Sequence, residues 1–235
     1  MTVRYEEGSL HGFVELQTLA GKDVAFGEIV QTVAGGRVTS RLVLRFLDGA
    51  LYDDTTVFTQ KRVFRLVHDH LIQRGASFKQ QMETTVDAAN GKISVRYRDK
   101  DGRQKDLAQQ MAIPEDVSNG LLFTILKNVR PDAPDTSVSM IATTPKPRIV
   151  KIRIVPGGYE NFSVGALRLQ AMHYVLKIDI GGITGVIAPL IGKQPPDIHG
   201  WVVETGSPAV IRNEGPLESD GPIWRLQPAP APSRR

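Results

Sequence analysis

The stretch LRLQAMHYVLKIDIGGITGVIAPLIGK, residues 167–193, decides the fold that we expect for the whole chain. Side chains alternate across a β-strand, so residues two apart in the sequence lie on the same face. In the first half of the stretch this alternation produces one apolar face and one mixed face. The sequence therefore predicts a long strand whose apolar face carries Met172, Tyr174, Leu176, Ile178 and Ile180.

The second half of the stretch predicts a flap. Gly181 and Gly182 end the alternation, and an apolar run follows at residues 183–191. This run is interrupted by Thr184, Gly185 and Pro189, and it is shorter than the ~20 residues with which a helix crosses a bilayer. We expect it to fold back over the open side of the sheet, with its glycines as hinges.

The first half of the chain predicts an antiparallel meander. Ala34-Gly35-Gly36, Asn90-Gly91 and Asp101-Gly102 have the composition of hairpin turns, because glycine adopts positive φ without steric cost. Alternating segments flank these turns, as expected for strands with one buried face. The predicted strands are residues 10–17, 23–33, 37–46, 51–60, 62–73, 81–88, 92–98 and 104–111.

One amphipathic helix is predicted at residues 114–130. Pro114 suits the first turn of a helix, acidic residues follow it, and Pro131 ends the helix. Apolar residues three and four apart form one stripe, which is the pattern of a helix packed on a sheet. The stripe consists of Val117, Leu121, Leu122, Ile125, Leu126 and Val129.

Strands resume after the helix, at residues 136–142, 147–155, 160–164, 198–204, 209–212 and 223–226, and Gly157-Gly158 is expected to form a turn. The Pro/Ala-rich tail, residues 227–235, is predicted to be disordered. The fold class is therefore mainly β. We expect a large curved antiparallel sheet of about ten strands, a half-barrel, with the amphipathic helix packed on it. Residues 1–226 form a single domain in this prediction.

The composition excludes several classes of function. The 235 residues contain no cysteine, which rules out disulfides, thiolate metal sites and cysteine nucleophiles. The net charge of +4 is modest, and the basic residues are spread along the chain with few aromatic residues between them, so we predict no nucleic-acid partner. Motifs of serine nucleophiles and phosphate-binding loops are missing from the sequence, and we predict no cofactor.

Two histidines form the alternative, metal-dependent interpretation. His68 and His70 lie two apart on a predicted strand, so both imidazoles project from one face. Such a pair can bind zinc if a third ligand is added, and His11, His173 and His199 are the other histidines. The spacing of these histidines in the sequence does not indicate which of them would be the third ligand. A sheet surface that carries two unliganded histidines is therefore the preferred interpretation, and no metal site is predicted.

Acidic residues are the other candidates for chemistry. A general acid and base could come from these carboxylates, but we expect them to lie in or beside turns, where acidic residues make local hydrogen bonds. On balance the sequence favours a protein that is not an enzyme. The carboxylates considered are Asp53, Asp54, Glu160, Glu204 and Glu214.

Several turn and packing segments lie within roughly residues 114–226. They are Thr144-Pro145-Lys146-Pro147-Arg148, residues 181–193, Glu214-Gly215-Pro216-Leu217 and Gly221-Pro222-Ile223-Trp224. With these segments the second half of the chain resembles an uncharacterised family of exported bacterial proteins, and the order of elements resembles a lipoprotein-carrier-like (LolA/LolB-type) half-barrel. The resemblance implies a periplasmic or exported location, although the N-terminal residues MTVRYEEGSLHGF show no apolar signal core. It implies no active-site residues.

The function expected from the sequence is binding of a hydrophobic or lipid-like ligand in the concave sheet of a bacterial envelope protein. A lipid or hydrophobic small molecule is the expected partner, with peripheral membrane contact as a further expectation. The alternatives are a metal-dependent hydrolase that uses His68 and His70 and a purely structural interaction domain. The expected ligand-binding residues are Leu122, Leu126, Met172, Tyr174, Leu176, Ile187, Leu190 and Trp201.

Overall fold

The described residues form one antiparallel sheet of fourteen strands that does not close into a barrel. The computed structural model describes residues 1–99, 101–133, 136–142, 144–164, 167–179, 195–204 and 206–229. The strand order is β8-β7-β6-β5-β4-β3-β2-β1-β14-β13-β12-β11-β10-β9. The elements are β1 (Leu10–Thr18), β2 (Asp23–Ala34), β3 (Arg37–Phe46), β4 (Leu51–Thr59), β5 (Arg65–Arg74), β6 (Met82–Asp87), β7 (Lys92–Arg98), β8 (Gln104–Gln110), α1 (Leu122–Asn128), β9 (Thr136–Ala142), β10 (Arg148–Val164), β11 (Leu167–Asp179), β12 (Ile198–Val203), β13 (Ala209–Gly215) and β14 (Trp224–Pro228).

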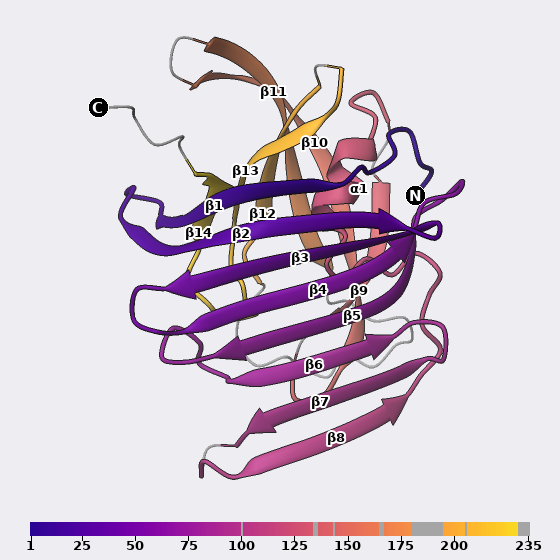
Figure 1. The fold of residues 1–235 in the computed structure, drawn as a ribbon, viewed down its shortest axis with the longest axis vertical. Helices are drawn as coiled ribbons and strands as arrows, with labels where there is room; N and C mark the ends of the chain where they lie inside the picture. The colour runs from indigo at the N-terminus through magenta and orange to yellow at the C-terminus, as the bar shows by residue number, and fades with distance from the viewer. Residues whose placement is uncertain are drawn as a thin grey trace.

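The sheet consists of two sequential meanders that meet at one pairing. Strands β1–β8 follow one another in space as in sequence, and so do β9–β14, while β1 pairs with β14. Figure 1 shows β2–β8 as one layer and β9–β13 behind it, with α1 beside them. The segment that contains α1 connects β8 to β9, which are the two ends of the sheet. The predicted mainly β, half-barrel-like fold class is confirmed, and the expectation of about ten strands was too low.

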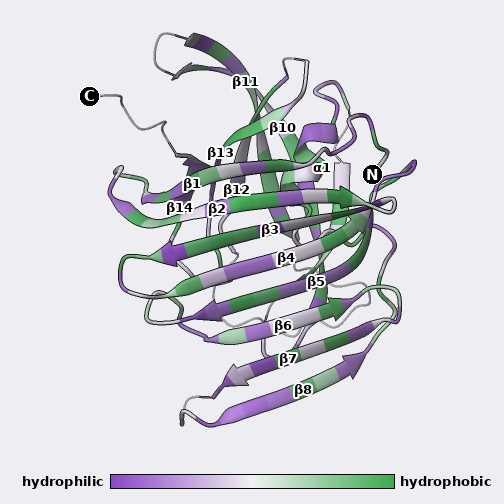
Figure 2. Cartoon of the chain, in the orientation of Figure 1, coloured by the Kyte–Doolittle hydropathy of each residue, from purple (hydrophilic) through white to green (hydrophobic). Residues whose placement is uncertain are grey.

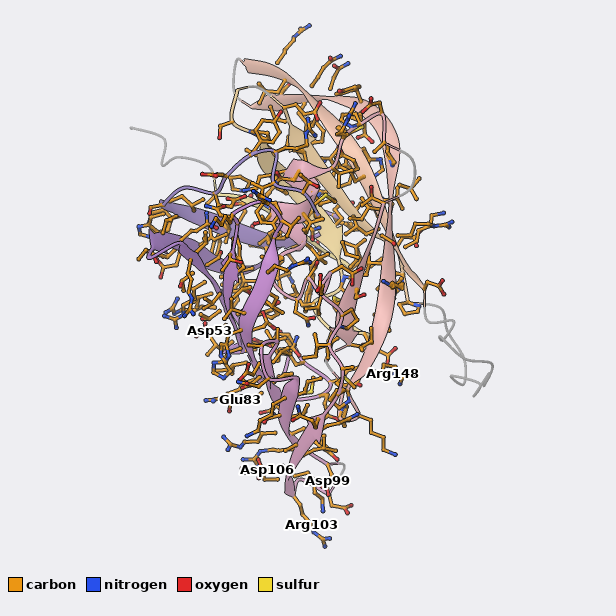
Figure 3. The ribbon with its side chains drawn as sticks, turned by 90° about the vertical axis from the view of Figure 1, so that its right-hand side faces the viewer. Asp53, Glu83, Asp99, Arg103, Asp106 and Arg148 are labelled. Carbon is orange, nitrogen blue, oxygen red and sulfur yellow. The ribbon has the colours of Figure 1, made fainter. Side chains whose placement is uncertain are left out.

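The two faces of the sheet differ in polarity. We call the side of each layer that faces the other layer the inner face, and the opposite side the outer face. Charged side chains occupy much of the outer face, where Arg41 pairs with Asp53 at 2.6 Å and Arg96 pairs with Asp106 at 2.8 Å. Figure 3 shows Asp53 on the side of the first layer turned away from the second. Polar and apolar residues consequently alternate along the strands in Figure 2, as period-two patterning requires.

Apolar side chains from both layers fill the space between them. One core cluster joins Val38 and Ile93 of the first meander to Ile152 of the second, and Leu126 of α1 belongs to it. A second cluster lies around Leu16, Phe46 and Trp224, near the β1–β14 pairing. Burial of this apolar area is the main stabilising contribution to such a fold.

Helix α1 is much shorter than predicted. It begins at Leu122, because Gly120 has φ +63° and Val117 forms a parallel bridge with Ser139 of β9. The backbone N–H of Ser118 donates to the Ser139 carbonyl at 2.9 Å. Residues 116–119 therefore cover part of the free edge of β9, which protects that edge from pairing with another chain.

Two other expectations about the second meander were wrong. Residues 157–158 form no turn, because β10 runs through them and pairs with β11 on both sides of a bulge between Pro156 and Gly158. Gln227 and Pro228 do not belong to a disordered tail, since both pair with β1. The predicted flap, with Gly181, Gly182 and residues 183–191, lies outside the described residues. Among the residues that are described, no helix has the length and apolar character needed to cross a membrane.

Candidate functional site

The sheet is incompletely paired where its two meanders meet. Strand β14 pairs with β1 from Val14↔Pro228 to Thr18↔Trp224, but with β13 only from Asn213↔Leu226 to Gly215↔Trp224. Within the described residues, positions 209–212 of β13 and 10–12 of β1 each have a strand partner on one side only. We call the gap bounded by residues 10–13, 209–212 and 227–228 the seam.

A cavity of about 440 Å³ lies at the seam. Its walls come from the inner faces of β1, β2 and β3, from α1 and from the strands that border the gap. Most of the side chains in these walls are apolar, and a few polar groups lie among them. The apolar part is formed by Val14, Ile29, Leu42, Phe123, Val210 and Leu226.

The short helix separates this cavity from the core. Phe123 and Lys127 are four residues apart, so they project from the same side of α1, and both line the cavity. Leu126 is 1% exposed and packs in the core cluster between the two layers. Gly200 of β12 makes this packing possible, because a Cβ there would lie 2.5 Å from Cδ1 of Leu126.

An ion pair neutralises the lysine in the cavity wall. Lys127 Nζ lies 2.6 Å from Glu7 Oε1, and Glu7 is 8% exposed. The side-chain amide of Gln31 donates to Glu7 Oε2 at 3.0 Å, and Gln60 hydrogen-bonds the Glu7 backbone at 2.6 and 2.9 Å. Because the carboxylate has several partners, its burial is compensated. The charge of Lys127 is thus already matched by a carboxylate of the protein.

Arg212 of β13 also lies at the edge of the cavity, but its side chain packs against rings on the outer face of the sheet. Its guanidinium carbon lies 4.7 Å from the ring centroid of Phe162 and 5.7 Å from that of Trp201. Its Nε has no hydrogen-bond partner, and no carboxylate of the described residues lies within ion-pair distance of it. Burial lowers the pKa of Arg212, and the charge of Arg225 lowers it further. Arginine nevertheless stays protonated in proteins, so its positive charge lies beside the rings of Phe162 and Trp201.

A stack of rings on the outer face fixes Arg212. Trp201 pairs with Arg212 across β12 and β13, and its ring stacks on His173 with a centroid distance of 4.6 Å. His173 Nε2 lies 2.9 Å from His199 Nδ1. Burial lowers the pKa of His173, although the charge of Glu160 opposes this. The His173 ring therefore supports the Trp201 ring, against which the guanidinium packs.

Two buried aspartates form a separate polar cluster on the inner face of the first meander. Asp54 and Asp69 lie in the middle of β4 and β5, and Thr56 Oγ1 donates to Asp69 Oδ1 at 2.9 Å. Burial raises the pKa of Asp69 to about 6. Burial, together with the charge of Asp69, raises the pKa of Asp54 well above its usual value. The expectation that Asp54 lies beside a turn was wrong. Because the core covers both carboxyl groups, we expect their ionisation to change the stability of the fold rather than to serve a reaction.

The pair predicts a loss of stability between pH 4 and pH 6. In this range the unfolded chain has released the Asp69 proton, with a pKa of 3.8, while the folded protein retains it up to about pH 6. The free energy of unfolding therefore falls as the pH rises, by about 3 kcal/mol for Asp69. Asp69→Asn keeps the acceptor for Thr56 but cannot ionise, so urea unfolding of this variant should show a shallower fall there, and the remaining slope comes from the raised pKa of Asp54.

The matched control for this measurement is Asp106→Asn on the outer face. Its hydrogen bonds with Gln104 and Arg96 lower the pKa of Asp106, so any contribution from this residue falls below pH 4. The control variant should keep the slope of the parent between pH 4 and pH 6. Equal slopes in the parent and in Asp69→Asn would contradict a raised pKa at Asp69.

The residues predicted to bind a ligand do not line this cavity. Leu126, Met172, Tyr174 and Leu176 are packed in the core, and Leu122 contacts the same core cluster. Trp201 lies on the outer face in a small cluster with Ala171 and Val203. Ile187 and Leu190 lie outside the described residues.

The histidine pair lies on the outer face, with both imidazoles on one side of β5 as predicted. Asp69 between them is 2% exposed and faces the inner side. His70 Nε2 is 2.9 Å from Glu83 Oε1, and His68 pairs across the strands with Asp87. The other histidines are on other strands: His11 contacts Glu28, and His173 contacts His199. The described part of the chain contains no group of three His, Asp or Glu residues arranged to hold a metal ion.

The sequence did not identify the residues that line the cavity, although it indicates on which face of its helix or strand each of them lies. Phe123 and Lys127 are off the apolar stripe of the predicted helix, while Ile29 and Leu42 alternate correctly with the inner faces of their strands. The pattern indicates which face each residue takes, but the seam depends on a pairing between the two ends of the chain.

No protein-family model, curated protein or solved structure matches this chain.

Proposed function

We propose that the protein is a non-enzymatic binding protein that takes a hydrophobic or lipid-like small molecule into the cavity at the seam. The cavity itself is the observation that carries the proposal. Its volume of about 440 Å³ falls in the range of about 300–1,000 Å³ of ligand pockets. Its mainly apolar walls with a few polar groups are also typical of such pockets.

The way in which the cavity is built also favours a ligand. The incomplete pairing of β13 with β14 leaves a gap beside the cavity, through which a small molecule can enter without breaking strand pairs. Leu10 and Phe13 border this gap and are 39% and 65% exposed. Exposed apolar side chains around an opening are a common feature of sites that take up apolar ligands.

The setting that we propose is the bacterial envelope, on the resemblance to exported proteins described above. Peripheral contact with a membrane belongs to the same proposal, because Phe13 at the opening and Phe26 on the outer face are large exposed apolar residues. Fractionation of the native cells, followed by immunoblotting, tests the location directly.

Binding of a dansyl-labelled fatty acid tests the function. We expect a dissociation constant in the micromolar range, about −8 kcal/mol. Gly12 lines the cavity, and a Cβ there would meet only Ile29 Cγ2, at 3.6 Å. Gly12→Leu should therefore fold but fill the cavity, and it should weaken binding by about tenfold or more, which corresponds to about 1.4 kcal/mol or more. Fluorescence titration measures both constants.

The control is Thr32→Leu, which adds the same side chain at an exposed position of β2. This variant should bind the probe as the parent does. If Gly12→Leu keeps both its melting temperature and its affinity for the probe, the ligand does not occupy this cavity. If the parent binds no probe at all, the proposal fails and the purely structural interaction domain becomes the better interpretation.

A further inference from the structure

The edge of β1 at the seam continues beyond the described end of β14. Val14 pairs with Pro228, and the backbone N–H of Ala229 donates to the Phe13 carbonyl at 2.9 Å. Beyond this point, residues 10–12 of β1 pair with β2 alone among the described residues. An edge of unpaired backbone N–H and C=O groups is a template for one more extended segment. The sequence continues after Ala229 with Pro-Ala-Pro-Ser-Arg-Arg, which lies outside the described residues.

The prolines of this segment alternate in phase with the hydrogen bonds of β1. In an antiparallel sheet, successive residues direct their backbone groups alternately to the two neighbouring strands. Ala229 directs its N–H to β1, so in a continued strand Ala231 does the same. Pro228, Pro230 and Pro232 then direct their nitrogens towards β13, and proline has no N–H to donate there. The alternation therefore fits pairing with β1 and not with β13, in agreement with the end of the β13–β14 pairing before Pro228.

The same register places the prolines beside the cavity. Residues that lie directly opposite each other in antiparallel strands have their side chains on the same face. Pro228 lies opposite Val14, and both line the cavity. Two residues further along, the register sets Pro230 opposite Gly12, which also lines the cavity. Another two residues reach Leu10, the first residue of β1, so a segment of three residues is long enough to follow the whole free edge.

We propose that residues 230–232 continue β14 along the free edge of β1, with Ala231 paired to His11, and that they cover the opening of the cavity. The backbone groups of His11 then have partners within the chain, and this part of the edge is closed to other chains. Entry of a ligand requires the three residues to leave the edge. The pairing does not depend on any ligand, whereas the effect on entry rests on the proposed function.

Amide hydrogen exchange at His11, followed by NMR spectroscopy, tests the pairing. We expect slow exchange in the parent, because the His11 N–H donates to the Ala231 carbonyl. Ala231→Pro removes the N–H with which Ala231 completes this pair, and it should accelerate exchange at His11 by about tenfold or more. The N–H of Gly12 points towards β2, so its exchange rate should stay unchanged and serves as the internal reference.

The matched control is Ala231→Val, which keeps the N–H at the same position. Exchange at His11 in this variant should match the parent. Equal exchange rates at His11 in the parent and in Ala231→Pro would overturn the pairing. Protection of His11 that decreases when the protein is diluted would also overturn it, because a second copy of the chain would then occupy the edge.

Stopped-flow mixing with the dansyl-labelled fatty acid tests whether the paired segment limits entry. Ala231→Pro should bind the probe about tenfold faster than the parent, because displacement of a covering segment commonly limits access to a closed site. Ala231→Val should bind at the rate of the parent. Equal association rates in the parent and in Ala231→Pro would overturn the covering of the opening. If the parent binds no probe, the proposed function fails, and exchange at His11 still decides whether the segment pairs with β1.

Discussion

Leu126→Asp is expected to abolish cooperative folding. Leu126 is 1% exposed, lies in the core between the two layers and packs against the backbone of β12 at Gly200. The substitution removes a buried leucine, at a cost of about 2–5 kcal/mol. It also places a carboxylate in a cluster of buried apolar side chains, which adds several kcal/mol more. The total is comparable to the whole stability of a typical domain, about 5–15 kcal/mol.

Circular dichroism during heating measures this effect. Leu47→Asp is the matched control, because Leu47 is 67% exposed in the turn between β3 and β4 and the same change should shift stability by less than about 0.5 kcal/mol. A Leu126→Asp protein that melts within a few degrees of the parent would show that α1 does not pack against the second layer.

Gly120→Ala is expected to destabilise the protein by about 4 kcal/mol. Gly120 has φ +63°, a conformation that costs alanine about 1–2 kcal/mol. A Cβ there would also lie 1.7 Å from Thr56 Oγ1 and 2.8 Å from Asp69 Oδ1. The turn that precedes α1 must therefore move away from β4 and β5, and the hydrogen bond between Thr56 and Asp69 is disturbed.

Gly102→Ala separates the two contributions to this effect. Gly102 has φ +77°, but no atom lies within 4 Å of its ideal Cβ position. This variant should lose only the conformational contribution, about 1–2 kcal/mol. Urea unfolding of both variants yields the difference between them, which measures the close approach of Gly120 to Thr56. Equal losses in the two variants would mean that the turn does not lie as close to β4 as described.

Local signals in the sequence were sufficient to predict most of the strands. The turn at Asn90-Gly91 lies between β6 and β7, and β3 has the predicted boundaries. The alternation of Met172, Tyr174 and Leu176 correctly predicts one buried face of β11. Each of these features depends on residues a few positions apart, so the sequence alone determines them.

Features that depend on tertiary contacts could not be predicted in this way. The apolar stripe suggested a helix from residue 114, but pairing with Ser139 keeps Val117 extended. The two glycines at 157–158 suggested a turn, but the strand continues because β11 pairs with both sides of the bulge. In both cases a partner that is distant in the sequence overrides the local preference.

The candidate site was less predictable than the fold for the same reason. The alternation places Tyr174 on the inner face, yet it cannot reveal that α1 covers this residue, whose hydroxyl donates to the Val129 carbonyl at 3.1 Å. The cavity instead lies where α1 leaves Ile29 and Leu42 uncovered.

The single pairing between β1 and β14 has a consequence for folding kinetics. Every other neighbouring pair of strands is also adjacent in sequence, so each meander can form by successive hairpins. Glu15 and Gln227 are 212 positions apart, and their contact requires the closure of a very long loop. Closing this loop costs conformational entropy before the contacts between β1 and β14 form. We therefore expect the joining of the two meanders to be the slow, late step of folding. Until it occurs, β1 is an open edge that carries Leu10 and Phe13, and the newly synthesised chain is most exposed to aggregation at the same place where the finished protein has its cavity.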